Sequence, residues 1–507
     1  MIARLRSILE ISSLRTTSLA ILVLTVLIIT PSIVQAQSDY IKPIDNFTTA
    51  GEAILPPKTY VWQEINGFCA WAATAMAMQY AGIDLSLYDV FAASSIGFSF
   101  AYFHVNDTIL MVPGALYTQV EPTDFLARLY GVNYTLYVGT EIPYLEQNVQ
   151  VWEREGISVG VLDNEDAAFN LMRDTLDSGY PLLISVDPSF LPAPDYQILR
   201  DEEISGGGHG ILIVGYNDTL QSATIVDPGV GSFGDNFGYP ADGRGNYTTI
   251  SYYDLTNAWS PRYFIASTFL PGETPPANFD DQLGKLIRDK LLGVGAIYSP
   301  YSANAYVGKF GQAGFRAMSK DITASGLKSY LSVFDGIANE IQFKASAIMF
   351  IGLGLEAQVT LQYLSYRTAL TALPHIMTKT NLTDFVIAGE KALPYFEEIV
   401  DNSTLINPTN ISKATGFVAT TFKAIAEAYN SSGDIDSAFA PYEDELNTIS
   451  TALLGIADSW RAAGRELAKY WPNDFLSQYG VVVVGGIGGV LILLVLFILW
   501  SRKRPSQ

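Results

Sequence analysis

The sequence predicts an α+β fold, in which an N-terminal domain with a helix packed on an antiparallel sheet precedes an all-α region and a C-terminal transmembrane helix. Three observations lead to this prediction. Helix-like and strand-like patterns alternate over residues 60–270. After a proline-rich linker at 271–277, helical periodicity prevails over residues 278–476. The run 480–500 carries no charge and is long enough to cross a bilayer.

The two ends of the chain predict its topology. Residues 1–36 combine arginines, an apolar run and a final small residue, which is typical of a secretory signal peptide. A polar lead-in segment follows at 37–59, and a basic cytoplasmic tail, 501–507, follows the transmembrane helix. We therefore expect a single-pass membrane protein at the cell surface, with an extracytoplasmic N-terminal body and a cytoplasmic C-terminus. An uncut signal would add a second anchor and leave the body outside.

Charge and composition narrow the classes of partner. The formal net charge is −21, which disfavours nucleic acid and anionic lipid as partners. The chain has one cysteine and therefore no internal disulfide, so its stability depends on an apolar core. Glycosylation is expected if the source organism modifies Asn-x-Ser/Thr sequences, which occur at Asn46, Asn106, Asn133, Asn217, Asn246, Asn381, Asn402, Asn410 and Asn430.

Individual elements follow from periodicity and from turn residues. In the N-terminal domain the patterns predict helices over 70–81, 122–130 and 167–176, strands over 182–186, 211–214 and 223–226, and a loop-rich sheet margin over 229–253. The turn Asn217-Asp218 joins the last two strands into a hairpin. In the second half we expect a helix over 278–292. The apolar segment 348–355 lies between Lys344 and Glu356, which favours a buried helix over a second membrane span.

One long helix near the membrane carries a heptad-like seam. Apolar residues alternate spacings of three and four at Leu446, Ile449, Leu453, Ile456, Trp460, Ala463 and Leu467. Such a seam fits either a stalk that forms a homo-oligomer or a helix that packs inside its own bundle. The second interpretation is favoured, because only three heptads are present.

The single cysteine, Cys69, lies where a helix is predicted to begin, so the positive end of the helix dipole favours its thiolate form. A thiol nucleophile needs a base, and the chain has three histidines. His104 and His375 are interpreted as solvated or packed side chains. His209 differs, because glycines flank it and it opens the predicted strand 211–214.

Two further residues complete a candidate site. Asp227 follows the hairpin that begins after His209, so adjacent antiparallel strands would bring the two side chains together. An Asp-Pro turn at the end of a strand is the alternative interpretation of Asp227. Gln63 precedes Cys69 by six residues, and its amide would complement the Cys69 backbone N–H in an oxyanion hole.

Together these residues resemble the papain-like cysteine peptidases, and specifically the C39-like branch. The resemblance covers roughly residues 60–270 and rests on Gln63, the run Gly67-Phe68-Cys69-Ala70-Trp71, Gly208-His209 before an apolar strand with Gly215-Tyr216, and Val226-Asp227-Pro228. It implies a papain-like fold with Cys69 as nucleophile, His209 as general base and acid, Asp227 as the residue that orients His209, and Gln63 as oxyanion-hole donor. Phe68 and Ala70 depart from many papain-like enzymes, which affects the subfamily more than the chemistry. The expected topology argues against the leader-peptide processing of the exporter-fused branch.

The sequence therefore predicts a membrane-anchored extracytoplasmic cysteine peptidase that cleaves a peptide or protein substrate. The same residues would serve a cysteine-dependent transpeptidase or amidotransferase. A catalytically silent surface binding protein is a third alternative, against which the intact Cys, His and Asp argue. We expect no cofactor and no metal, because the sequence has no CxxC, no HExxH and no phosphate-binding loop.

Overall fold

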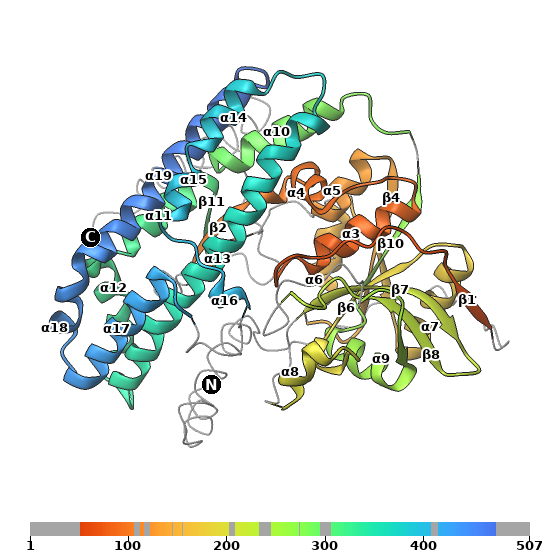
Figure 1. Cartoon of the computed structure of the whole chain (residues 1–507), viewed down its shortest axis with the longest axis horizontal. Coiled ribbons are helices and arrows are strands. Elements are labelled where there is room, and N and C mark those ends of the chain that lie inside the picture. The colour runs from red at the N-terminus through yellow and green to blue at the C-terminus, as the bar shows by residue number, and fades with distance from the viewer. Residues whose placement is uncertain are drawn as a thin grey trace, which may run out of the picture.

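The computed structural model describes residues 51–105, 112–115, 122–143, 145–154, 156–201, 208–232, 245–272, 274–294, 306–406 and 414–472. The predicted signal peptide and transmembrane helix lie outside these ranges. Within them, a half built around a large sheet lies beside a half built almost entirely from helices (Figure 1). An α+β N-terminal domain followed by a helical region is therefore confirmed.

The large sheet has the strand order β5-β4-β10-β6-β7-β8-β9, with β1 paired to β7 outside this path. The strands are β1 (Glu52–Ile54), β4 (Val132–Gly139), β5 (Ser158–Leu162), β6 (Leu182–Val186), β7 (His209–Asn217), β8 (Ser222–Val226), β9 (Thr248–Ser251) and β10 (Ala266–Pro271). The expectation of an antiparallel sheet is correct for every pair except β4 with β5, which is parallel. The chain returns from β4 to β5 through a helix, as a parallel pair requires.

Seven α-helices accompany this sheet in the described residues: α3 (Cys69–Tyr80), α4 (Leu87–Ala93), α5 (Pro122–Leu129), α6 (Leu145–Arg154), α7 (Glu165–Asp177), α8 (Gln197–Asp201) and α9 (Tyr252–Trp259). The three helices predicted from periodicity correspond to α3, α5 and α7. Helix α7 is capped at its N-terminus, because the Asn164 side chain accepts a hydrogen bond from the Ala167 N–H at 2.9 Å. The expected loop-rich sheet margin at 229–253 contains β9, the last strand in the sheet order, and the first residues of α9.

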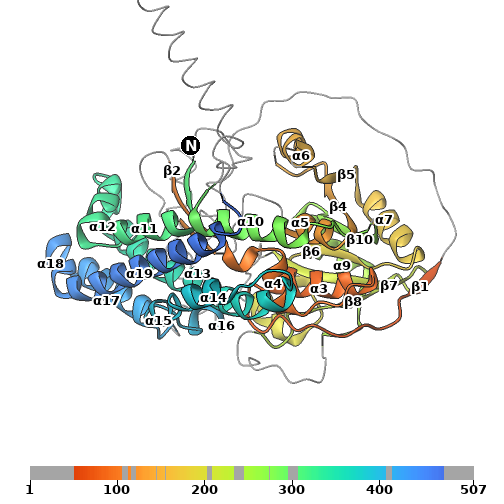
Figure 2. The same cartoon turned by 90° about the horizontal axis from the view of Figure 1, so that it is seen from above.

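Helix α3 packs against the central strand β7 (Figures 1 and 2). Four of its alanines, Ala72, Ala73, Ala75 and Ala77, are 0% exposed, and their small side chains allow a close approach between helix and strand. The approach is closest at Gly210, where a Cβ atom would lie 2.9 Å from the Cα of Ala70. A glycine is therefore required beside His209 if the N-terminus of α3 is to lie against the start of β7.

The helical half contains α10 (Phe279–Leu292), α11 (Gly311–Asp321), α12 (Ala324–Leu331), α13 (Glu340–Ile376), α14 (Thr383–Glu390), α15 (Leu393–Glu397), α16 (Ser403–Ile406), α17 (Phe417–Ser432), α18 (Ile435–Phe439) and α19 (Glu443–Ala468). All seven residues of the heptad-like seam lie on α19 and are 0% exposed. They face α10, α11 and other helices of the same chain. Packing inside the bundle therefore explains the seam, and association of a second copy through this helix stays a prediction.

Helix α13 is, among the described residues, the one helix long and apolar enough to cross a membrane by length and composition alone. Its surroundings are those of a core helix. It packs against α17 in one half and against α4 in the other. It also buries charged and polar side chains, including Lys344, Glu356 and Gln362. This agrees with the interpretation of 348–355 as part of a buried helix.

The prediction that the second half is all-α was wrong. This half contributes the strand β11 (Tyr306–Phe310) to a sheet of order β11-β2-β3. The partners β2 (Phe100–Val105) and β3 (Val112–Ala115) come from the N-terminal half. The rings of Phe100 and Phe315 stack with centroids 3.8 Å apart. The Tyr102 hydroxyl donates to Asp321 at 3.0 Å. The two halves are thus joined by a shared sheet and a shared core.

Candidate active site

Cys69 is the first residue of α3 and is partly exposed. The first N–H groups of a helix have no acceptor within the helix, so they point toward whatever lies at its N-terminus. Here the backbone N–H groups of Ala70 and Gly210 donate to the Cys69 side chain. The thiol therefore lies in a positive environment built from helix α3 and the start of β7.

His209 is the first residue of β7, and its ring is a hydrogen-bonding partner of the Cys69 thiol. Its Nε2 atom lies 2.7 Å from Oδ1 of Asp227, which follows directly after β8. The exposed fractions are 7% for His209 and 2% for Asp227, so the pair is shielded from water. With Nε2 facing the carboxylate, Nδ1 is the ring nitrogen left to face the sulfur. The structure thus brings together three of the four predicted site residues.

The pKa shifts at the site follow from this arrangement. Burial opposes the charged form of His209, but the negative charges of Asp227 and Cys69 outweigh it and raise the pKa of the imidazole to about 10. Burial also opposes ionisation of Cys69, and the positive charge and hydrogen bond of His209 together with the two backbone donors lower the pKa of the thiol below 9.0. The site therefore favours a thiolate–imidazolium pair.

The position of Asp227 is set by its backbone as well as by its side chain. Its N–H donates to the Gly245 carbonyl at 2.7 Å, and its own carbonyl accepts the Tyr60 hydroxyl at 2.7 Å. The Gly229 N–H donates to Oδ1 at 2.8 Å. This is the geometry of an Asp-Pro turn at the end of a strand, so the two interpretations of Asp227 describe the same residue.

Gln63 lies on the other side of the turn that follows Asp227. Its backbone N–H donates to the Pro228 carbonyl at 3.0 Å, and its Nε2 donates to the Ser232 hydroxyl at 2.5 Å. The Ser232 hydroxyl in turn donates a hydrogen bond to the Gly229 carbonyl at 2.6 Å. Gln63 is 1% exposed, and its Oε1 has no hydrogen-bond partner in the part of the chain that the structure describes. One N–H of the amide is engaged and the second is available to another acceptor.

Sequence reasoning missed Tyr196, Gly229 and Ser232. The Tyr196 hydroxyl lies within hydrogen-bonding distance of both His209 and Asp227. A Cβ atom at Gly229 would lie 2.5 Å from Cε1 of His209, so only glycine fits there without displacing the ring. Gly229 directly follows Asp227-Pro228, and Ser232 lies three residues later, so the turn after Asp227 could have indicated both residues. Nothing in the pattern around Pro194-Asp195-Tyr196 marks the tyrosine.

The other two histidines lie elsewhere. His375 is exposed near the end of α13. His104 lies on β2, where its backbone is paired with Val307 of β11. Within the described ranges no group of three or more His, Cys, Asp and Glu side chains is placed to hold a metal ion.

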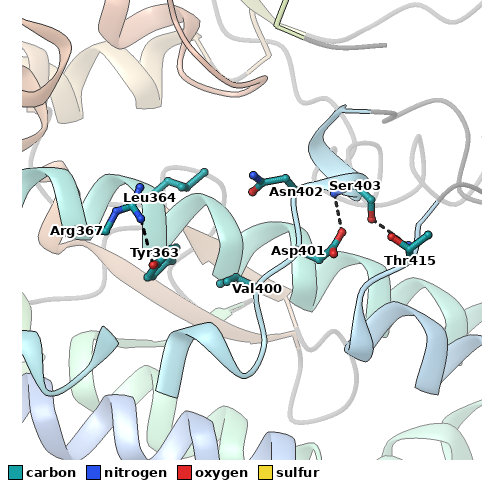
Figure 3. Close-up of a pocket in the computed structure, with 8 residues that line it drawn as sticks. All are labelled: Tyr363, Leu364, Arg367, Val400, Asp401, Asn402, Ser403 and Thr415. Atoms are coloured by element: carbon teal, nitrogen blue, oxygen red, sulfur yellow. Dashed lines mark hydrogen bonds between the residues drawn. The ribbon is translucent and has the colours of Figure 1, made fainter. Parts of the chain in front are cut away.

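An open groove of about 550 Å³ lies in the helical half, beside α13 (Figure 3). Its polar groups mainly bond to one another. Arg367 donates to the Tyr363 hydroxyl at 3.3 Å, and the Ser403 N–H donates to Asp401 at 2.7 Å. The residues that line the groove include no pairing of a nucleophile with a base, so the pairing of Cys69 with His209 is the candidate site.

Comparison with known protein families agrees with this placement. Residues 56–254 match the model of the Peptidase_C39 like family. The matched segment contains Cys69, His209, Asp227 and Gln63, and it ends within α9. The resemblance to C39-like, papain-like cysteine peptidases is therefore confirmed for the sheet half. No curated protein matches the chain.

Proposed function

We propose that the protein is a cysteine peptidase that cleaves peptide bonds through Cys69, His209 and Asp227. The observation that carries the proposal is the continuous contact from the Cys69 thiol through the His209 ring to the Asp227 carboxylate, which lies 2.7 Å from Nε2. A nucleophile, a base and a group that orients the base are the three parts that thiol catalysis requires. The C39-like match of the surrounding domain supports the same reaction class.

In the proposed reaction, the Cys69 thiolate attacks the carbonyl carbon of the scissile peptide. The His209 imidazolium then gives its proton to the leaving amine as the C–N bond breaks and a thioester forms. Water adds to the thioester, with neutral His209 taking a proton from it, and the acid product leaves as the thiolate returns. The Asp227 carboxylate orients the His209 ring and stabilises the imidazolium.

The tetrahedral intermediates carry a negative oxygen that needs donors. The backbone N–H of Cys69, at the free end of α3, is one such donor. The second N–H of the Gln63 amide is the proposed partner, and its hydrogen bond to Ser232 at 2.5 Å would hold that amide in place. Removing one such donor typically costs 10²–10³-fold in turnover.

The proposed location is the outer face of a membrane. It rests on the predicted signal peptide 1–36 and the predicted transmembrane helix 480–500 with its basic tail. The substrate would then be a peptide or protein outside the cytoplasm.

The test uses the extracytoplasmic body, residues 37–476, and measures alkylation of Cys69 by iodoacetamide at pH 7. We expect the wild type to react at least tenfold faster than His209→Ala, because the imidazolium maintains the thiolate. His375→Ala is the matched control and should react like the wild type, since His375 is exposed on α13. Equal rates for wild type and His209→Ala would refute the proposal. Hydrolysis of a mixed peptide library by the wild type and not by Cys69→Ser completes the test.

A further inference from the structure

We propose that Tyr196 is a positioning residue of this site, whose hydroxyl group keeps Asp227 oriented toward His209. The inference rests on the proposed function and adds to it a side chain that no pattern in the sequence indicates. Tyr196 ends the short 3₁₀ helix η3 (Pro194–Tyr196), which precedes α8.

The hydroxyl of Tyr196 lies within hydrogen-bonding distance of both carboxylate oxygens of Asp227 and of Nε2 of His209. It lies 2.9 Å from Oδ2 and 3.1 Å from Oδ1 of Asp227, and 3.2 Å from Nε2 of His209. Oδ1 already accepts from Nε2 and from the Gly229 N–H. The Tyr196 proton therefore serves Oδ2 best, so that each carboxylate oxygen has a donor and the plane of the carboxylate is fixed.

Tyr196 also excludes water from the pair, since its side chain is 1% exposed. In such a site an unpaired carboxylate oxygen would be costly, because it would lose its hydration and gain no donor in return. Burial and the charge of Asp227 raise the pKa of the Tyr196 phenol well above its ordinary value. The hydroxyl therefore keeps its proton and stays a donor across the whole working pH range.

The backbone that carries Tyr196 is docked on the loop that follows Asp227. The Asp195 carboxylate accepts the Gly231 N–H at 2.8 Å. A Cβ atom at Gly229 would lie 2.7 Å from the Tyr196 oxygen, so this glycine lets the loop pass directly beside the phenol. These two contacts hold the Tyr196 hydroxyl beside Asp227.

The consequence of removing the hydroxyl follows from these contacts. Without a donor on Oδ2, the carboxylate can rotate away from Nε2 or admit water, and either change weakens its interaction with the imidazolium. The pKa of His209 would fall and that of Cys69 would rise. The pH range in which thiolate and imidazolium coexist would therefore become narrower from both sides.

The experiment is the pH dependence of Cys69 alkylation in Tyr196→Phe, on the full extracytoplasmic body. We expect the acid limb, which reports formation of the Cys69 thiolate, to move up by about one pH unit and the rate at pH 7 to fall about 3–10-fold. The matched control is Tyr252→Phe in the same domain, whose hydroxyl donates to the carboxylate of Asp218 at 2.9 Å. This control loses an equivalent hydrogen bond and should keep the wild-type pH profile.

The outcomes separate the two proposals. If wild-type Cys69 reacts no faster than in His209→Ala, the proposed function itself fails. If the wild type is reactive but Tyr196→Phe keeps its pH limits, or loses rate only as much as Tyr252→Phe, the positioning role is refuted. As a second measurement, Tyr196→Phe is combined with Asp227→Asn. In the Asp227→Asn background, Tyr196→Phe should not lower the alkylation rate further, because the carboxylate that the hydroxyl orients has already been replaced. Additive losses of rate from the two substitutions would also overturn the proposal.

Discussion

Replacing Asp227 by Asn removes one charge from a buried pair and changes little else. The Asp227–His209 contact is 2.7 Å between Oδ1 and Nε2. For charges about 4 Å apart at an effective dielectric constant of about 20, the interaction is about 4 kcal/mol, equivalent to about 3 pKa units. Losing it would bring the pKa of His209 from about 10 back toward its ordinary 6.5. The imidazole would then be less basic than the thiolate, and the neutral pair would prevail.

We therefore expect Asp227→Asn to slow alkylation of Cys69 at pH 7 by about 10²-fold, with the acid limb of the pH profile moved to higher pH. The assay is the pseudo-first-order rate with iodoacetamide from pH 5 to 10, followed by mass spectrometry. Asp218→Asn is the matched control, because Asp218 also accepts several donors, among them Arg173 and Tyr252, but lies away from Cys69. A rate for Asp227→Asn within threefold of the wild type would show that the carboxylate does not maintain the ion pair.

Three further predictions test other parts of the structure. Gly229→Ala should reduce the alkylation rate at pH 7 at least tenfold, because the added methyl would lie 2.5 Å from Cε1 of His209 and would displace the ring. The temperature of thermal unfolding should change little. An unchanged alkylation rate would contradict this prediction. A fragment that ends at residue 277 should aggregate or fail to unfold cooperatively, because it exposes the buried side chains of Phe98, Phe100 and Tyr102. Burial of each such side chain contributes about 1.5–3 kcal/mol to the free energy of unfolding. A monomeric fragment that unfolds cooperatively would contradict this prediction. Burial raises the pKa of Glu356 to about 7 from an ordinary 4.5, so the folded state holds an extra proton between these values and stability falls as pH rises through them. Glu356→Gln should reduce the fall in the free energy of unfolding between pH 5 and pH 8 by up to about 3 kcal/mol, as measured by urea unfolding at the two pH values. Glu427→Gln, at an exposed position of α17, should leave that fall unchanged.

The parts of the site that the sequence could predict are those tied to local backbone. Cys69 begins a helix, His209 begins a strand, and Asp227 ends the strand that pairs with it, so turns and periodicity alone bring them near one another. Tyr196 could not be found in this way. It reaches the His–Asp pair from a short turn between β6 and β7, and its place depends on tertiary docking through Asp195 and Gly231.

The same distinction holds for the fold. Helices α3, α5, α7 and α10 have clear periodicity or capping residues and were predicted within a few residues. The strand β11 was missed, because its pairing partner β2 lies about 200 residues earlier and its own pattern is short. For α19, the heptad spacing gave the buried face but could not say which surface covers it, and the structure supplies neighbouring helices of the same chain.

The helical half supports the loop that leads to Cys69. Gly67, two residues before Cys69, has a φ of +106°, and a Cβ atom there would lie 3.0 Å from Leu361 on α13. One residue later on α13, the Gln362 amide donates to the Gly97 carbonyl at 2.7 Å, which ties the same helix to the segment that follows α4. The N-terminus of α3 is thus held between β7 on one side and α13 on the other. Since about 1 Å of misplacement can cost 10²-fold in rate, residues outside the matched segment 56–254, such as Leu361, are expected to contribute to the reactivity of Cys69.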